Sequence, residues 1–172
     1  FSLSCLPKDE FPLIETDSKN LKKITVKSQT ILNLINKTKF AISNEETRYF
    51  LNGLYFNISS NENTSNLTFV GTDGHRLATS SSILNTSIEN YDNIEIEISS
   101  NKIIFYIDQL ILISKLIDGN FPDYTRVIPK NNTNDLMINR ENLLSAVDRV
   151  STIANEKSPS IKFKLLENLI NL

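Results

Sequence analysis

The sequence predicts an α+β fold built from antiparallel sheets with helices on one face, in tandem repeated domains. Short segments in which apolar and polar residues alternate are typical of half-buried strands. Two longer segments carry apolar residues at every third or fourth position, which is typical of amphipathic helices. The first strand and helix also have a counterpart with the same apolar pattern later in the chain, which indicates an internal repeat.

The chain has 172 residues, of which 40% are hydrophobic and 22% are charged. This composition excludes a disordered tail. We expect no membrane span, because no apolar run approaches the ~18 residues that a spanning helix needs. The first residues do not form a basic segment followed by an apolar one, so we expect no signal peptide and a cytoplasmic location.

The 18 basic and 20 acidic side chains give a formal net charge of −2. This balance argues against a domain that binds DNA over its whole surface, so contact with DNA would need a local basic face. Cys5 and His75 are too few ligands for a structural zinc site, and a single cysteine cannot form an internal disulfide. We expect neither a metal nor a cofactor.

The first predicted helix covers residues 28–42 and follows a short strand at 24–26. Ser28 is predicted to be its N-cap, since a serine side chain can accept a hydrogen bond from the first turn. Mostly apolar residues at helical spacing predict one buried stripe: Ile31, Leu34, Ile35, Thr38 and Ile42. Three basic residues lie off this stripe and would either meet phosphates or only solvate the helix: Lys27, Lys37 and Lys39.

Strand-like segments follow this helix. They cover residues 49–58, 67–72, 76–82, 94–98, 102–107 and 110–116. Short polar connections join the last three, which predicts an antiparallel meander. Within 94–98, Glu95 and Glu97 alternate with isoleucine, so we expect both carboxylates on a solvated face.

A polar linker at residues 131–134 marks the predicted domain boundary. After it, residues 136–138 predict a short strand, and a second helix begins at Asn139 or Arg140. The second helix carries apolar residues at helical spacing: Leu143, Leu144, Val147, Val150 and Ala154. This strand and helix repeat the apolar pattern of the first, and the final residues predict the first hairpin of the repeated unit.

Residues 72–75 predict a turn, and two interpretations of its chemistry are open. Asp73 and His75, with the serines at 80–82, are the residue types of a Ser-His-Asp hydrolase. The members of such a triad normally come from separate parts of a fold. The favoured interpretation is therefore a turn in which Asp73 and Gly74 supply the backbone geometry, and no catalytic residue is assigned.

Three motifs give the chain a resemblance to a known family. Residues 72–78 read Thr-Asp-Gly-His-Arg-Leu-Ala, and residues 48–53 read Arg-Tyr-Phe-Leu-Asn-Gly. Residues 114–124 read Ser-Lys-Leu-Ile-Asp-Gly-Asn-Phe-Pro-Asp-Tyr. With these motifs in this order, the chain resembles the bacterial sliding clamp, the beta subunit of DNA polymerase III, over nearly its whole length.

The resemblance implies a DNA-clamp fold with one complete domain flanked by partial ones. Residues 1–20 would be the exit segment of a missing first domain, 21–129 the middle domain and 130–172 the truncated start of a third. The family is a non-catalytic processivity factor of chromosomal DNA replication, which closes as a head-to-tail homodimer around duplex DNA. We expect no such dimer from this chain alone, because both halves of the family's subunit contact are absent or incomplete.

The resemblance also implies two binding surfaces. A hydrophobic cleft of the middle domain would take short linear peptides from the replicative polymerase, the clamp loader and repair polymerases. Its lining would be Leu51, Thr72, Gly74, His75, Arg76, Leu77, Pro122, Arg126 and Val127. Duplex DNA would be contacted without sequence readout, through phosphates, by pore-facing groups at Lys27, Lys37 and Lys39.

The sequence departs from the family after the strand at 76–82. The family has a second pore helix before the meander, whereas this chain has only residues 83–93, which include no basic side chain. A helix by itself averages ~11–12 residues, so this interval is too short to contain one as well as its connections. Its loss would uncover an apolar strip of sheet. The alternative interpretation is therefore a truncated, internally deleted clamp remnant without full clamp activity.

Overall fold

The computed structural model describes residues 5, 7, 21–61, 64–84, 92–153 and 160–172. The chain divides into two units, Phe1–Thr125 and Arg126–Leu172. Across the described residues, no helix is long and apolar enough to cross a membrane.

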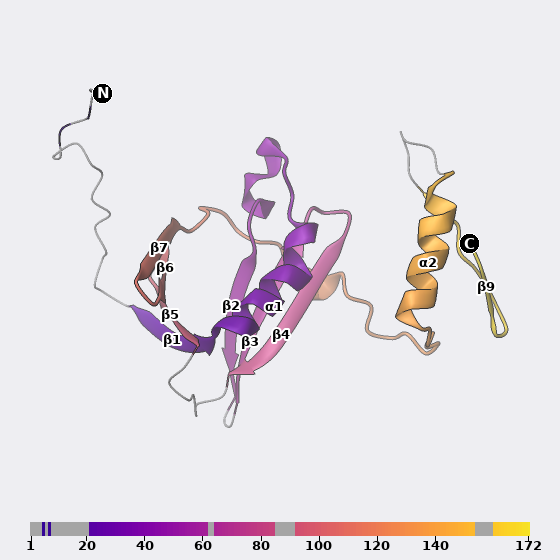
Figure 1. Ribbon diagram of the computed structural model, residues 1–172, viewed down its shortest axis with the longest axis horizontal. Coiled ribbons are helices and arrows are strands. Elements are labelled where there is room, and N and C mark those ends of the chain that lie inside the picture. Colours follow the sequence, from indigo (N-terminus) through magenta and orange to yellow (C-terminus); the bar gives the residue numbers. More distant parts are fainter. Residues whose placement is uncertain (1–4, 6, 8–20, 62–63, 85–91, 154–159) are drawn as a thin grey trace. The chain divides into compact units, whose positions relative to one another are not determined.

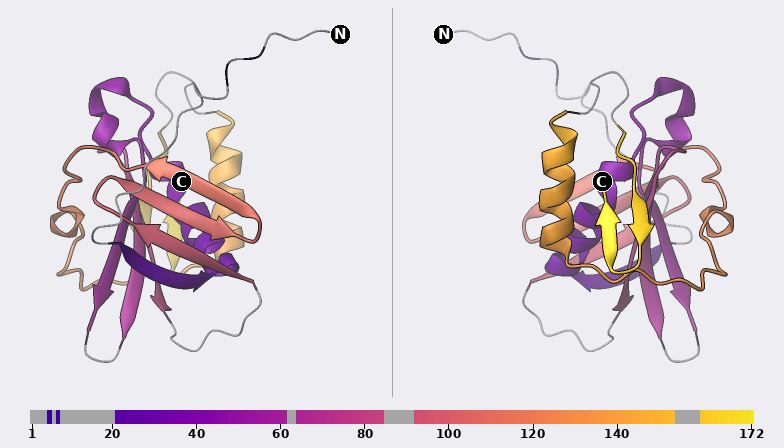
Figure 2. Two further views of the ribbon diagram at one scale, coloured as in Figure 1. Left: turned by 90° about the vertical axis from the view of Figure 1, so that its left-hand side faces the viewer. Right: turned by 90° about the vertical axis from the view of Figure 1, so that its right-hand side faces the viewer.

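The described part of the first unit contains two antiparallel sheets (Figures 1 and 2). One sheet has the strand order β1 (Lys22–Lys27), β5 (Asn93–Ile98), β6 (Lys102–Ile107) and β7 (Leu110–Lys115). The other has the order β2 (Tyr55–Ser60), β3 (Ser65–Thr72) and β4 (Leu77–Leu84). Strand β1 therefore pairs with β5, with Ile24 opposite Ile96.

The predicted meander is present in the four-stranded sheet. β5 and β6 are joined by a short turn in which the Ser99 N–H donates to the Lys102 carbonyl at 2.9 Å. β6 and β7 are joined at Asp108, which has a φ of 49°. Aspartate tolerates this left-handed conformation better than most residues, because its short polar side chain can bond locally. The strand-like segments and their short polar connections thus predicted these three strands to within one residue at each end.

Helix α1 (Ser28–Thr38) packs on β3 and β4 (Figure 1). The predicted stripe is buried at Ile31, Leu34 and Thr38. Core side chains come from both sheets and the helix: Val26, Ile31, Leu34, Leu67, Phe69, Ile94, Ile96 and Ile103. The hydrophobic core therefore joins the two sheets to α1.

Both ends of α1 differ from the prediction. Ser28 is not the N-cap: the cap is Lys27, which makes no side-chain capping bond. Because β1 runs directly into the helix, the Ser28 N–H donates to the Asp92 carbonyl at 2.9 Å instead. The helix ends at Thr38 rather than at residue 42, and a 3-10 turn over Lys39–Ala41 follows.

The strand predicted at residues 49–58 is wrong in its first half. Glu46–Leu51 is a 3-10 helix, and β2 begins at Tyr55. The β propensity of the Tyr-Phe-Leu run is outweighed by tertiary contacts. Arg48 bonds to the Asp73 carbonyl, and Leu51 is only 4% exposed.

The expected solvated face of β5 is wrong for Glu97. Glu95 is exposed, but Glu97 is only 7% exposed. Its carboxylate forms an ion pair with the Lys23 ammonium of β1 and accepts a hydrogen bond from the Tyr106 hydroxyl of β6 at 3.2 Å. Since β5 lies between β1 and β6, long side chains from both neighbours cover this carboxylate.

In the second unit, the predicted helix is present as α2 (Arg140–Ser151). Asn139 is its N-cap, and the side-chain oxygen of Asn139 accepts hydrogen bonds from the N–H groups of Glu141 and Asn142, both at 3.0 Å. The predicted hairpin is formed by β8 (Lys164–Leu166) and β9 (Leu169–Asn171).

The strand predicted at residues 136–138 is wrong. This segment has no regular structure, and Met137 is 96% exposed. A strand needs a hydrogen-bonded neighbour, and the only sheet in the described part of this unit is the β8–β9 hairpin. Ala154, expected on the helix, lies outside the described residues.

The interval expected to lack the family's second helix is partly strand. β4 continues to Leu84 and β5 begins at Asn93, while residues 85–91 lie outside the described residues.

Leu110 and Leu112 of β7 are 60% and 52% exposed. Both pair in register with β6 residues that pack against the core, namely Ile107 and Phe105. The apolar face of the four-stranded sheet therefore continues to the exposed strand β7.

Candidate functional site

The turn between β3 and β4 holds five of the predicted cleft residues. Gly74 has a φ of +86°, a conformation that glycine adopts without steric cost. The Thr72 hydroxyl donates to the Arg76 carbonyl at 2.7 Å and accepts from the Gly74 N–H at 3.1 Å. The N–H groups of His75 and Arg76 both donate to Asp73 Oδ1 at 2.9 Å. These bonds fix the backbone of the turn.

Asp73 is the central acceptor of the turn. The N–H groups of Arg76 and His75 lower the pKa of its carboxyl to about 2, and the Arg76 guanidinium adds to the effect. Arg76 Nε donates to Asp73 Oδ2 at 3.0 Å. The Arg76 guanidinium carbon also lies 5.9 Å from the centre of the Phe40 ring. Asp73 is therefore ionised at neutral pH and holds Arg76 in one place.

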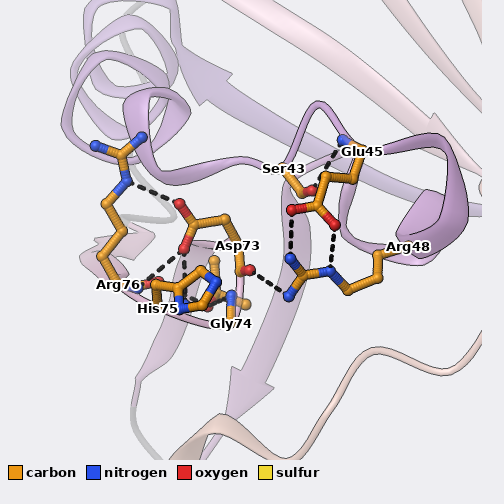
Figure 3. A network of polar contacts seen from close by, with 8 residues as sticks. Ser43, Glu45, Arg48, Asp73, Gly74, His75 and Arg76 are labelled. Atoms are coloured by element: carbon orange, nitrogen blue, oxygen red, sulfur yellow. Dashed lines mark hydrogen bonds and ion pairs between the residues drawn. The ribbon is translucent and has the colours of Figure 1, made fainter. Parts of the chain in front are cut away.

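A second arginine approaches the turn from the 3-10 helix Glu46–Leu51 (Figure 3). Arg48 Nη1 donates to the Asp73 carbonyl oxygen at 2.8 Å, and Arg48 Nε donates to Glu45 Oε2 at 2.8 Å. A further bond joins Arg48 Nη2 to Glu45 Oε1. The guanidinium lowers the pKa of Glu45, and Glu45 raises the pKa of Arg48. Glu45 is not among the site residues predicted from the sequence, although its spacing to Arg48 suits a local ion pair.

The predicted cleft residues of the turn differ in exposure. Gly74, His75 and Arg76 are exposed, Leu77 is half-buried, and Thr72 is 6% exposed. Leu51, the other predicted apolar residue of this region, is 4% exposed. The turn therefore presents two polar side chains to solvent beside one partly exposed leucine.

Pro122 is exposed and belongs to the same unit. Its neighbour Phe121 stacks on Tyr55 of β2, with ring centres 4.8 Å apart, and Tyr124 contacts the same ring at 6.1 Å. These contacts fix the segment on β2. Arg126 and Val127 are exposed and lie in the second unit, so their place in the cleft stays a prediction.

The three predicted DNA-facing lysines are all exposed, but they come from different elements. Lys27 ends β1, Lys37 lies in the last turn of α1, and Lys39 begins the following 3-10 turn. Lys37 also borders a shallow polar groove between α1 and β4. The groove is lined by Thr30, Asn33, Leu34, Lys37, Ser80, Ser81 and Ser82.

The hydrolase interpretation has no support in this geometry. Both carboxylate oxygens of Asp73 accept hydrogen bonds, from the backbone N–H groups and from Arg76. In the described residues, the His75 imidazole makes no hydrogen bond to the serines at 80–82. The same part of the chain has no group of three His, Cys, Asp or Glu residues that could hold a metal ion.

The two antiparallel sheets, helix α1 and the turn define a DNA-clamp fold of the α+β class. A family model described as the DNA polymerase III beta subunit, central domain, matches residues 25–90, and one described as its C-terminal domain matches residues 125–172. The chain therefore belongs to the bacterial sliding clamp family, the beta subunits of DNA polymerase III.

Curated relatives and solved structures agree with this family. The chain is 36% identical over 193 residues to the beta sliding clamp of Caulobacter vibrioides NA1000, covering 100% of this chain and 52% of the relative. It is 33% identical over 192 residues to that of Escherichia coli K12, covering 100% and 51%. The crystal structure of the Bartonella birtlesii sliding clamp bound to griselimycin matches with a TM-score of 0.84 and 37% identity, over 96% of this chain and 50% of that one. The chain thus spans about half the length of its relatives.

Proposed function

We propose that this protein acts in chromosomal DNA replication as a sliding clamp. In that role it is a non-catalytic, cytoplasmic processivity factor that encircles duplex DNA and tethers the replicative polymerase. The support is family membership, together with the turn motif at residues 72–78, which stands intact and is held by its own hydrogen bonds. The head-to-tail homodimer that closes the ring belongs to the full-length family, and we do not expect it from this chain alone, which spans about half the length of its relatives.

The proposed partner site is the peptide cleft at the turn. The observation that carries it is the exposure of His75 and Arg76 beside the half-buried Leu77, on a turn whose backbone is fixed by Asp73. A polar rim next to an apolar surface suits an extended peptide with leucine or phenylalanine anchors. Short peptides of the polymerase, the clamp loader and repair polymerases are the proposed occupants.

A fluorescence polarisation titration tests the cleft directly. The probe is a fluorescein-labelled hexapeptide with leucine and phenylalanine side chains, titrated with the 172-residue chain. We expect saturable binding, competition by griselimycin, and about tenfold weaker binding for His75→Ala, because a polar contact is lost from the rim. Thr79→Ala, an exposed change on β4, is the control and should bind as the unaltered chain does. No saturable binding at millimolar protein would reject the cleft.

The alternative, a clamp remnant without full activity, is favoured by two observations. The alignment with the Caulobacter clamp covers 193 residues, whereas the whole chain has 172. Leu110 and Leu112 of β7 are also exposed, although they lie on the same face of the sheet as the β6 residues that pack against the core. Static light scattering distinguishes the ring-forming sliding clamp from the remnant by molar mass. A closed, ring-sized dimer formed by this chain would reject the remnant, whereas monomers that still bind the peptide would show a docking module without ring closure.

A further inference from the structure

Arg48 occupies an unusual position for a residue so close to the exposed turn. Its Nη1 donates to the Asp73 carbonyl oxygen, while Nε and Nη2 both donate to the Glu45 carboxylate (Figure 3). Each of the three guanidinium nitrogens therefore has a partner within the unit. Its side chain is 31% exposed, against 59% for the side chain of Arg76. The guanidinium of Arg48 thus makes contacts within the unit, whereas the side chain of Arg76 is accessible to a ligand.

The contact with Asp73 acts on the backbone of the turn. The Asp73 carbonyl belongs to the peptide that leads into Gly74, the residue with φ +86°. A Cβ placed on Gly74 would lie 2.7 Å from Arg48 Nη1, so the guanidinium packs directly against this glycine. The bond from Arg48 therefore orients the Asp73–Gly74 peptide, one residue before His75.

Glu45 determines where Arg48 can point. An arginine side chain has many rotamers, and a bidentate carboxylate restricts them to one planar arrangement. Glu45 is itself tied to the core, because its N–H donates to Ser43 Oγ at 3.1 Å and Ser43 is 3% exposed. The Ser43 N–H in turn donates to the Leu51 carbonyl at 3.1 Å. A chain of contacts therefore runs from the buried Ser43 through Glu45 and Arg48 to the turn.

We propose that Arg48 is a positioning residue for the peptide cleft and that Glu45 holds it in place. Arg48 acts through the Asp73 carbonyl: it sets the backbone from which His75 and Arg76 project, without contacting the peptide. This assignment rests on the proposed function, since it names how that site is organised. Peptide affinity should then depend on Glu45, which lies outside the predicted lining of the cleft and carries a charge opposite to that of Arg76 at its rim.

The test compares two neutralised glutamates that are adjacent in sequence. In Glu45→Gln the Arg48 ion pair is removed, and in Glu46→Gln an exposed neighbour loses the same charge. Arg48→Ala removes the guanidinium and its bonds to Asp73 and Glu45. Arg48→Lys keeps a positive charge and a single donor group. We expect peptide binding to weaken about tenfold in Arg48→Ala, about threefold in Glu45→Gln and Arg48→Lys, and less than twofold in Glu46→Gln.

A second readout does not involve the peptide. Amide hydrogen exchange at His75 and Arg76 reports the two bonds to Asp73 Oδ1. We expect faster exchange at both amides in Arg48→Ala and Glu45→Gln, but not in Glu46→Gln, while amides of β3 keep their protection and show that the unit is folded.

If the unaltered chain binds no peptide, the proposed function fails, and exchange alone decides the positioning role. Weaker binding in Arg48→Ala with unchanged exchange would overturn the proposal, because Arg48 would then contact the peptide directly. Equal exchange in Glu45→Gln and Glu46→Gln would overturn the role of Glu45.

Discussion

The carbonyl oxygen of Thr38 lies 2.5 Å from the point where a side chain on Gly71 would begin. Thr38 ends α1 and Gly71 lies in β3, so the end of the helix rests on the sheet at a place where only glycine fits. Because the obstructing atom is backbone, a side chain here could be accommodated only by moving the helix away from the sheet. This close approach links the core of the unit to the strand that leads into the candidate site.

Gly71→Ala should therefore destabilise the first unit, by about 1–3 kcal/mol, as expected for overpacking in a core. Urea denaturation followed by circular dichroism measures the loss. Gly53→Ala is the matched control, since the added methyl would meet the flexible end of the Ile117 side chain at 2.7 Å. That side chain can rotate, so the control should lose less stability. Equal losses would show that the helix end is free to shift.

Gly74→Ala should cost stability for a different reason. The φ of +86° is disfavoured for residues with a Cβ, at a cost of about 1–2 kcal/mol. Asparagine tolerates left-handed conformations better than alanine does, so Gly74→Asn should lose less than Gly74→Ala in the same urea experiment. If asparagine costs as much as alanine or more, the contact with the Arg48 guanidinium rather than the backbone angle limits this position.

Much of this geometry follows from local sequence. The Asp-Gly pair at residues 73–74 predicted the turn, because these residue types favour tight turns, and strict alternation predicted the first strand of the meander at residues 94–98. Local sequence could not show that Arg48 bonds to the Asp73 carbonyl, since those residues are far apart in the chain. Tertiary contacts, this bond and the burial of Leu51 among them, outweigh strand propensity over residues 46–51. The burial of Glu97 was missed for the same reason, because Lys23 and Tyr106 reach it from separate strands.

Asp73→Asn should change the pH dependence of stability. Asparagine keeps an acceptor for the N–H groups of His75 and Arg76 but loses the charge. The pKa of Asp73 is lowered to about 2, so its charge stabilises the folded state above the ordinary value of ~3.9, and this stabilisation is lost as the pH falls through about 2. The melting temperature of Asp73→Asn should lie below that of the unaltered chain at pH 7, and the two should converge near pH 2. Asp118→Asn, in an exposed segment, serves as the control and should show no such convergence.

Glu97→Gln should destabilise the four-stranded sheet more than Glu95→Gln. The two residues lie on the same strand, but Glu97 is 7% exposed and bonds to both Lys23 and Tyr106. When the charge of Glu97 is removed, the Lys23 ammonium keeps only its ion pair with the more exposed Glu95. Lys23 also lowers the pKa of Glu97, so the difference between the two variants should be largest at neutral pH and should shrink as Glu97 becomes protonated in acid. Urea midpoints at pH 7 and pH 3 measure it, and equal midpoints at pH 7 would show that burial of this carboxylate adds nothing.

Lys37→Ala tests whether α1 faces DNA. Lys37 is exposed at the border of the groove that also contains Asn33 and the serines of β4. A lysine that meets a phosphate displaces a counterion, so its removal should lower the slope of log affinity against log salt concentration by about 0.9. Fluorescence anisotropy with a labelled duplex, measured from low salt upward, gives this slope. Lys115→Ala, on the edge strand β7, is the control and should leave the slope unchanged.

Because phosphate contacts carry no sequence information, the effect of Lys37→Ala should be the same for duplexes of different sequence. An unchanged slope would remove Lys37 from the DNA-facing surface, whereas a sequence-dependent effect would indicate contact with base edges rather than the loose contact a sliding ring requires.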